Sequence, residues 1–378
     1  MPNGKGAIRI PVDSPKVIGT ASSRGSREYQ EDAYTVSAIK LNPSILRRTA
    51  ERENGAHAWD PPATDQFAYQ VLFAGIYDGH GGTAVSHYLQ ENMHKVFENV
   101  DTRTVPDIVS AIKEYGGYFR RFKGGALEPW AQTGWDLDEH TEMNLTLEAY
   151  ATLAFLRIDL DIAKTIPESA DCGATASVAI IHSLDMPESP FYSADWLSVT
   201  VAHCGDTRGI LCRSDGRTIP MTANHHADER GETSRLRRWG AAMVMDSFNE
   251  LRFMGSLANT RCLGDIRFRQ FGVTPEPEVH THVAQGHTLS SMVLVSDGIS
   301  GVLSDGEISD LVRSKAHIGP EASAKEVIDF AEEMGTDDNC SIIVIPLPAW
   351  STKYKDLTKD LREYRLSGAA NSSRQRRM

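Results

Sequence analysis

Short apolar runs recur along this chain, and each is flanked by an acidic residue beside glycine or asparagine. The run VLFAGIYDGHGGTAV (71–85) passes into Asp-Gly-His-Gly-Gly, and MVLVSDGISGVL (292–303) repeats the change. In LSVTVAHCGDTRGILC (197–212), Gly-Asp follows a run in which apolar and polar residues alternate. In GTDDNCSIIVIPL (335–347), the two acids come before the apolar run. Runs that are rich in β-branched residues and bounded by turn residues predict buried strands of a sheet or sandwich.

Apolar residues at helical spacing lie between these strand-like runs. They predict helices near residues 85–100, 105–115, 145–163, 228–239, 308–314 and 324–334. Central strands with long helices between them indicate an α+β protein in which two packed sheets are flanked by helices. We therefore expect a single folded domain over residues 1–347.

Three segments depart from this core pattern. Residues 41–67 are polar with paired prolines, and we expect a long hairpin loop there. Residues 116–144 mix aromatic and charged side chains, which predicts an ordered insertion. Residues 348–378 form a C-terminal tail that ends SGAANSSRQRRM, and its last part is expected to be mobile.

The acids at the ends of the apolar runs indicate a metal site. Carboxylates gathered at one rim of a core repel each other and lose hydration, so they need cations nearby. The motifs contain few Lys or Arg residues, and oxygen ligands without a zinc-like Cys or His pair favour magnesium or manganese. GSREYQEDAYTVSAI (25–39) adds Glu31, Asp32 and Arg27, a side chain suited to a phosphate dianion. Acids for two metals plus an arginine predict phosphoryl transfer or phosphate hydrolysis.

Composition agrees with this reading and narrows it. The formal net charge of −12 argues against a nucleic-acid partner and fits a carboxylate-rich site. Five cysteines within strand-like motifs indicate small buried side chains in a reducing compartment. The sequence has neither an apolar run of membrane-spanning length nor a signal or transit pattern at its start. We expect an intracellular protein, cytoplasmic or mitochondrial, and favour a monomer.

Seven motifs follow one another along the chain: Arg27 with Glu31-Asp32, YDGHGG (77–82), CGATA (172–176), CGDTRG (204–209), NTRCLGD (259–265), SDGISGVL (296–303) and DDNCSIIVI (337–345). Taken together, they resemble the metal-dependent serine/threonine phosphatases of type 2C. The resemblance extends from about residue 19 to residue 345, and NTRCLGD in place of the more usual VSRALGD is similar to a fungal branch associated with mitochondria. It implies a four-layer αββα sandwich with a metal site at one end, and hydrolysis of phosphoserine and phosphothreonine in proteins. It also implies two tightly bound Mn²⁺ or Mg²⁺ ions, with room for a weaker third.

The resemblance also implies roles for the acids. Asp78 bridges the two ions. Asp297 and Asp338 complete the site of one ion, and Glu31 with the Gly79 carbonyl completes the site of the other. A water between the ions, its pKa lowered towards neutrality, supplies the hydroxide that attacks phosphorus.

Other residues receive supporting roles from the same resemblance. His80 protonates the leaving serine or threonine oxygen, and Arg27 binds the phosphate. Asp206 holds the third, weaker ion, and the alternative of a turn aspartate stays open. The residues expected to orient ion-bound water are Asp32, Thr175 and Asn339.

The sequence also departs from the family pattern. Asn224 stands where the substrate-side flap usually has an acid before a histidine, so substrate preference does not carry over. Arg269 stands where lysine is common. His225 and His226 are adjacent and are expected to point apart, which argues against a zinc pair.

Two other functions share some of these features. A pseudophosphatase that serves as a binding or scaffold module would keep the fold but usually loses metal acids, and none of the core acids is missing. A two-metal phosphodiesterase or nuclease would need a basic surface for its polyanion, which the acidic charge balance disfavours.

Overall fold

Two antiparallel sheets form the centre of the protein. The computed structural model describes residues 11–53, 59–61, 68–114, 145–237, 243–245, 251–255 and 257–370. One sheet has the order β11-β5-β4-β3-β2 with β10 beside β4, and the other has the order β1-β13-β12-β6-β7. The strands of the first sheet are β2 (Ala33–Lys40), β3 (Gln70–His80), β4 (Gly173–Ser183), β5 (Trp196–Cys204), β10 (Leu263–Gly264) and β11 (Glu278–Gln285). Those of the second are β1 (Gly19–Ser23), β6 (Arg208–Arg213), β7 (Thr218–Pro220), β12 (Leu289–Val295) and β13 (Cys340–Pro346).

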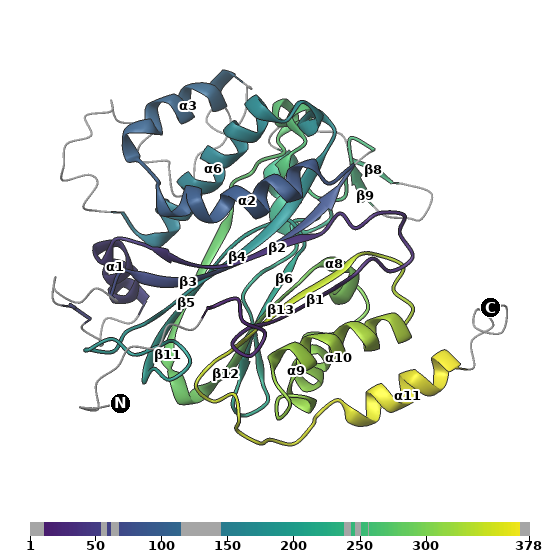
Figure 1. The fold of residues 1–378 in the computed structure, drawn as a ribbon. Coiled ribbons are helices and arrows are strands. Elements are labelled where there is room, and N and C mark those ends of the chain that lie inside the picture. The colour runs from purple at the N-terminus through teal and green to yellow at the C-terminus, as the bar shows by residue number, and fades with distance from the viewer. Residues whose placement is uncertain are drawn as a thin grey trace.

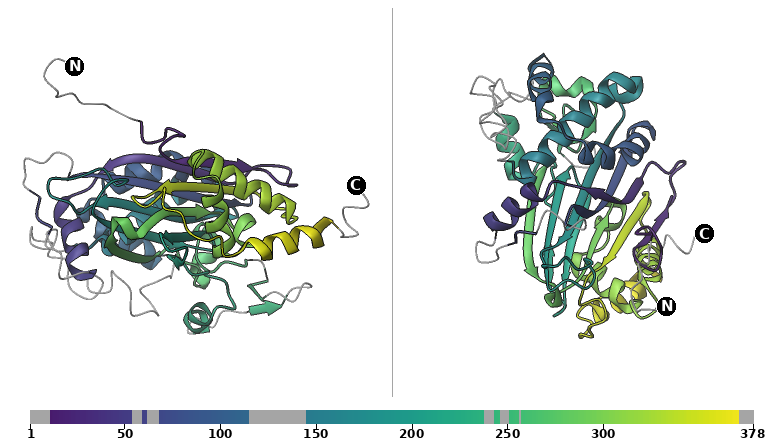
Figure 2. Two further views of the ribbon diagram at one scale, coloured as in Figure 1. Left: turned by 90° about the horizontal axis from the view of Figure 1, so that it is seen from below. Right: turned by 60° about the vertical axis from the view of Figure 1, so that its left-hand side comes forward.

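Helices cover the outer face of each sheet, which gives the four layers expected from the sequence (Figures 1 and 2). Helices α2 (Ala84–Glu98) and α6 (Leu147–Thr165) lie over the sheet that contains β3, and α3 (Val105–Glu114) packs against α6. Helices α9 (Asp305–Ser314) and α10 (Pro320–Glu333) lie over the other sheet, beside the short α8 (Asp297–Ser300). The α+β sandwich and the helices near residues 85–100, 105–115, 145–163, 308–314 and 324–334 are thereby confirmed.

The alternation of side chains along β3 explains how the sheet packs against the second sheet on one face and against helices on the other. Leu72, Ala74 and Ile76 point to the core between the two sheets, while Phe73 and Tyr77 point to the core beneath the helices. Successive side chains of a strand face opposite sides, so a strand with helices on one face and a sheet on the other must be apolar throughout. A strand of this kind can expose polar groups only at its ends. The acidic motifs lie at those ends.

The remaining elements lie around this frame. The segment that follows β7 contains α7 (Arg230–Arg237), which matches the helix expected near 228–239, and the ribbon of β8 (Met243–Met245) and β9 (Leu251–Phe253). Single turns of 3₁₀ helix are η1 (Thr102–Thr104), η2 (Pro167–Ala170), η3 (Ile266–Phe271) and η4 (Gly286–Thr288). Among the described residues, no helix has both the length and the apolar character needed to cross a membrane.

One expectation about the outer segments was wrong. The stretch 41–67 is not simply a hairpin loop, because it begins with helix α1 (Pro43–Glu53), which buries Ile45, Leu46 and Ala50 against the main core. The tail contains α11 (Lys359–Ala370), where Arg365 forms an ion pair with Glu307 of α9. The insertion predicted at 116–144, and the tail after residue 370, lie outside the described residues.

Candidate active site

Three aspartates from different strands meet at one rim of the sandwich. Asp78 lies near the end of β3, Asp206 follows β5, and Asp297 follows β12. One carboxylate oxygen of each lies within 4.8 Å of the other two. The first sheet therefore contributes Asp78 and Asp206, and the second sheet contributes Asp297. The sequence predicted this meeting point, because it placed each acid at the end of a buried strand.

Two of these carboxyl groups, those of Asp78 and Asp297, are buried next to further acidic side chains. Burial raises the pKa of Asp78 well above its ordinary value, and the charges of Asp297 and Asp32 raise it further. Burial, together with the charge of Asp206, raises the pKa of Asp297 to about 7. Burial also raises the pKa of Asp32 to about 6, and no described residue donates a hydrogen bond to its buried Oδ1 atom. A hard divalent cation fits such a set of oxygen donors, because it would remove the repulsion and restore the lost solvation.

Asp206 differs from the other two acids of the cluster. Its Oδ2 atom accepts hydrogen bonds from His226 Nε2 at 3.0 Å and from Asn259 Nδ2 at 2.7 Å. Burial alone would raise the pKa of Asp206, but the contacts with His226 and Asn259 lower it below its ordinary value. The Asp206 hydrogen bond in turn raises the pKa of His226. One oxygen of this carboxylate is therefore already held by protein groups.

Glu31 is fixed beside the cluster by backbone contacts. Its Oε1 atom accepts the Gly82 N–H at 2.6 Å, and its carbonyl oxygen accepts the Ser86 hydroxyl at 2.6 Å. A side chain at Gly79 would place its Cβ 2.4 Å from the Glu31 carbonyl oxygen. The glycine is thus required by the close approach of the Glu31 backbone, a reason that differs from the metal contact expected from the sequence.

Asp338 and Arg27 form an ion pair at the edge of the rim. Arg27 Nη2 donates to Asp338 Oδ2 at 2.6 Å, and the Arg27 side chain is 55% exposed. The other oxygen of Asp338 accepts the Asn339 backbone N–H at 2.8 Å. The structure thus brings the predicted phosphate ligand and a predicted metal ligand together, and in this arrangement they bind each other.

The three residues expected to orient water lie at the rim in different settings. Asp32 accepts a hydrogen bond from the Ser296 hydroxyl at 2.8 Å, next to Asp297. Thr175 lies opposite Asp78 in the register of β3 and β4. The amide of Asn339 binds protein backbone: it donates to the carbonyls of Arg24 and Tyr29 and accepts the Glu31 N–H at 2.7 Å. Asn339 therefore holds the loop that carries Arg27 and Glu31.

His80 has an acidic partner that the sequence analysis did not identify. Its Nε2 atom lies 2.6 Å from Asp265 Oδ2, and Asp265 also accepts a weak hydrogen bond from Cys262 Sγ at 3.2 Å. Burial lowers the pKa of His80, but the hydrogen bond and charge of Asp265 outweigh this and raise it above its ordinary value. The only signal in the sequence was Asp265 itself, at the end of NTRCLGD.

The segment after β7 is attached to the site through buried polar contacts. Glu232 of α7 forms ion pairs with Arg235 and Arg261, each at 2.6 Å. His225 accepts the Gly205 N–H at 2.9 Å and stacks on His203. His225 and His226 therefore contact different partners, Gly205 and Asp206.

The other notable polar residues stabilise the structure. Arg269, noted as a departure from the family pattern, is buried and pairs with Asp159 of α6 at 2.6 Å. All five cysteines are buried free thiols, and burial raises the pKa of Cys204 and of Cys340 to about 12. A buried thiol with a raised pKa is a poor nucleophile at neutral pH, so neither Cys204 nor Cys340 is suited to that role.

Two packed sheets with a carboxylate-rich rim, an exposed arginine and a histidine at that rim define a metal-dependent phosphoryl hydrolase. Comparison with known proteins identifies the family, because the Protein phosphatase 2C model matches residues 113–340. The chain belongs to the protein phosphatase 2C family. Protein phosphatase 2C homolog 4 of Schizosaccharomyces pombe is 34% identical over 356 residues, which cover 92% of this chain and 85% of that protein.

A further relative and two solved structures share less sequence identity with the chain. Protein phosphatase 1K, mitochondrial, of Xenopus laevis is 27% identical over 346 residues, which cover 90% of this chain and 70% of that protein. The solved structure of a serine-threonine phosphatase 2C from Toxoplasma gondii has a TM-score of 0.55 at 15% identity and covers 89% of this chain and 96% of that one. A C. elegans sex determining protein has a TM-score of 0.60 at 18% identity, with coverage of 89% and 67%. These two structures support the fold.

Proposed function

We propose that the rim around Asp78 is where this metal-dependent serine/threonine phosphatase hydrolyses phosphoserine and phosphothreonine in proteins. The activity and its dependence on Mn²⁺ or Mg²⁺ follow from family membership. The assignment to particular residues rests on one observation: oxygens of Asp78, Asp206 and Asp297 lie within 4.8 Å of each other, and two of these three acids have raised pKa values.

The proposed ion ligands come from both sheets. Asp78 would contribute to both sets, with Asp297 and Asp338 as further ligands of one ion and Glu31 with the Gly79 carbonyl as further ligands of the other. When bound, two divalent ions would supply a nucleophilic water at neutral pH and would neutralise charge on the phosphate oxygens. The buried Oδ1 atom of Asp32 is free to accept a hydrogen bond from a water beside them.

Arg27 is proposed to bind the phosphate group of the substrate. Its guanidinium lies at the rim with more than half of its side-chain surface exposed, and its fork of N–H donors suits two phosphate oxygens. The present partner of Arg27 is Asp338, which is also a proposed ion ligand. Engagement of Asp338 by a cation would free Arg27 for the substrate, so the two events are expected to reinforce each other.

His80 is proposed to give its proton to the leaving serine or threonine oxygen. Asp265 fixes the ring through Nε2 and favours its protonated form. The alkoxide of a serine or threonine is a poor leaving group, and a positioned acid of this kind typically contributes a factor of about 10²–10⁴.

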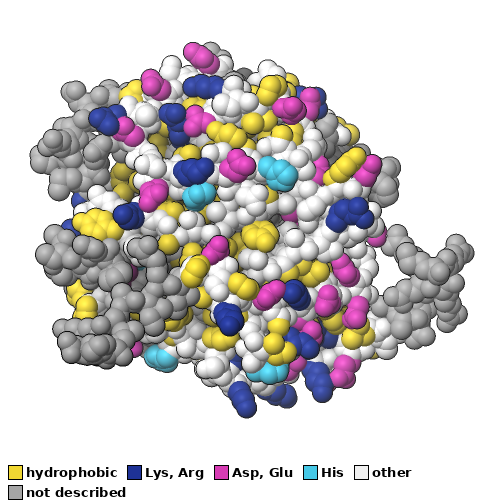
Figure 3. Space-filling model, in the orientation of Figure 1, with side chains coloured by type: hydrophobic (Ala, Val, Ile, Leu, Met, Phe, Trp, Pro, Cys, Tyr) yellow, Lys and Arg dark blue, Asp and Glu magenta, His cyan; other side chains and the backbone are white. Residues whose placement is uncertain are grey.

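The acidic rim favours a monoesterase over the alternatives. In the view of Figure 3, Lys and Arg side chains are interspersed with Asp and Glu and form no large basic area on that face. A polyanion such as nucleic acid requires such an area. The scaffold alternative is not favoured either, since Glu31, Asp78, Asp297 and Asp338 are all present.

The compartment, the oligomeric state and a role in signalling are also part of this proposal. We propose a monomeric enzyme that acts in signalling in the cytoplasm or mitochondria. The mitochondrial part is supported by the name of the Xenopus laevis relative. Fractionation of cells that express the tagged chain would test the compartment, and light scattering would test the monomer.

The decisive experiment uses Asp78→Asn. The wild-type chain is assayed with a phosphoserine peptide and an aryl phosphate in Mn²⁺, Mg²⁺ or chelator, beside a phosphodiester. We expect metal-dependent monoester hydrolysis, no diester hydrolysis, and loss of turnover in Asp78→Asn without loss of the folded circular dichroism spectrum. A nearly normal rate in the variant would place the site elsewhere.

A further inference from the structure

An exposed aromatic side chain lies on the loop that carries two of the proposed site residues. The loop comprises residues 24–31, between β1 and β2, and includes Arg27 and Glu31. Tyr29 lies midway between them in the chain and is 66% exposed. Consecutive residues advance by at most about 3.6 Å, so the Cα atom of Tyr29 lies within about 7 Å of the Cα atoms of both. A peptide whose phosphate binds at Arg27 therefore passes close to Tyr29.

Hydrogen bonds hold the backbone of this loop in place. The side-chain amide of Asn339, which is buried, donates to the carbonyl oxygens of Arg24 at 2.9 Å and of Tyr29 at 3.0 Å. Next to Tyr29, the side-chain amide of Gln30 donates to the carbonyl oxygen of Ser23 at 3.0 Å. The ring of Tyr29 thus extends from a backbone that is already fixed. Such a ring loses little further freedom when a peptide packs against it, which favours binding.

The charges beside Tyr29 do not favour a charged partner. Arg24 and Arg27 lie on the same loop with exposed side chains and would repel a basic side chain of a substrate. Glu28, which is also exposed, and Glu31 would repel an acidic one. An apolar side chain meets neither repulsion, and its contact with the ring removes apolar surface of both groups from water.

We propose that Tyr29 is a specificity-determining residue, which contacts an apolar side chain one or two positions from the phosphoserine or phosphothreonine of the substrate. An extended peptide advances by roughly 3.3 Å per residue, so these positions are within reach of the ring when the phosphate is at Arg27. The proposal rests on the proposed function, because it takes the rim around Asp78 as the place of hydrolysis. It assigns Tyr29 to recognition of the peptide and not to the chemical step.

The experiment measures kcat and KM for a set of phosphoserine peptides in saturating Mn²⁺. The parent peptide has blocked ends and three alanines on each side of the phosphoserine. Leucine or arginine replaces alanine at each of the two positions before and the two positions after it. In the wild type we expect leucine at one of these positions to raise kcat/KM about tenfold, mainly through KM, because the leucine side chain is buried against the ring. Tyr29→Ala should lose this gain, and Tyr29→Phe should keep it, since the face of the ring makes the contact.

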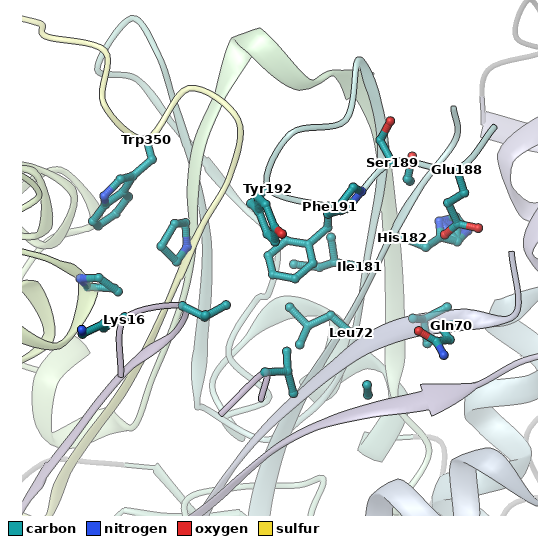
Figure 4. A pocket seen from close by; sticks show the side chains of 18 residues that line it. Lys16, Gln70, Leu72, Ile181, His182, Glu188, Ser189, Phe191, Tyr192 and Trp350 are labelled. Carbon is teal, nitrogen blue, oxygen red and sulfur yellow. The ribbon is translucent and has the colours of Figure 1, made fainter. Parts of the chain in front are cut away.

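Tyr192→Ala is the matched control, because it removes an exposed tyrosine far from the rim. Tyr192 is 46% exposed and lines a cavity of about 630 Å³ together with Leu72 (Figure 4). Leu72 and Asp78 lie on the same strand, β3, about 20 Å apart. The Tyr192→Ala variant should therefore keep the full preference for leucine.

Hydrolysis of p-nitrophenyl phosphate reports separately on the active site. Hydrolysis by the wild type and not by Asp78→Asn supports the proposed function whatever the peptides show. A wild type that hydrolyses this ester but gains nothing from leucine at any position, or gains more from arginine, would overturn the role of Tyr29 alone. An undiminished gain from leucine in Tyr29→Ala would do the same. Loss of aryl phosphate hydrolysis in Tyr29→Ala would also overturn it, because the ring would then be structural.

Discussion

Asp265→Asn tests whether the acid beside His80 assists proton transfer to the leaving group. The substitution keeps the size of the side chain, and asparagine tolerates the left-handed backbone of this residue, where φ is 48°. Only the charge opposite His80 Nε2, now at 2.6 Å, is removed. A hydrogen bond that involves a charged group contributes roughly 1.5–3 kcal/mol, and a neutral one about 1 kcal/mol. The difference of about 0.5–2 kcal/mol predicts a loss of rate of roughly 2- to 30-fold, since 1.36 kcal/mol is tenfold.

The loss should depend on the leaving group. Phosphoserine peptide and p-nitrophenyl phosphate are compared under saturating Mn²⁺, with kcat measured for each. An aryl oxide leaves without a proton, so Asp265→Asn and His80→Gln should both slow the peptide strongly and the aryl ester little. Asp305→Asn, which breaks the ion pair with Arg208 on β6, is the matched control. It should not change the ratio of kcat for the peptide to kcat for the aryl ester. Equal losses on the two substrates in Asp265→Asn would refute the proposed proton transfer.

Three further predictions concern the metal and phosphate ligands. Arg27→Ala should raise both KM for the phosphopeptide and the inhibition constant of inorganic phosphate about tenfold, because a half-exposed guanidinium supplies one charge-assisted contact; unaltered constants would make Arg27 structural. Asp206→Ala should lower kcat substantially while calorimetry still finds two tight metal ions; a destabilised protein with an unchanged rate would instead mark a turn residue. In chelator, the melting temperature should fall as the pH rises from about 5 to 8, because Asp32 and Asp297 have raised pKa values and the folded state holds more protons than the unfolded chain in this range. Added Mn²⁺ should remove this dependence, and identical pH profiles with and without metal would contradict the site.

The sequence predicted the sandwich because its strands are buried on both faces. A run such as Val293–Val295 is apolar at every position, and its meaning does not depend on distant residues. Helix α1 was missed for the opposite reason. Its apolar Ile45, Leu46 and Ala50 do recur at helical spacing, but the charged residues between them gave the segment a polar composition that was taken for a loop.

The candidate site was predicted residue by residue, but its pairings were not. Asp265 and His80 are 185 positions apart, and the sequence contains no information about which carboxylate an imidazole will meet. The same holds for Asp206 with His226, and for Asp338 with Arg27. Such pairs depend on how two separate loops approach each other at the end of a strand. The end of a strand can be predicted from a sequence, whereas the contact between two loops is seen only in the three-dimensional structure.

The pairing of β1 with β13 has a consequence for how this enzyme is made. The register places Ser23 opposite Cys340, and the Glu31 N–H is held by Asn339, 308 positions later in the chain. Most of the polypeptide is therefore synthesised before Asn339 and β13, which hold the loop of Arg27 and Glu31, are present. Until β13 emerges, a nascent chain carries Glu31 and Asp78 but lacks the strand that fixes them against Asp297. The candidate site therefore takes its final arrangement only after the segment of Asn339 and β13 has been synthesised.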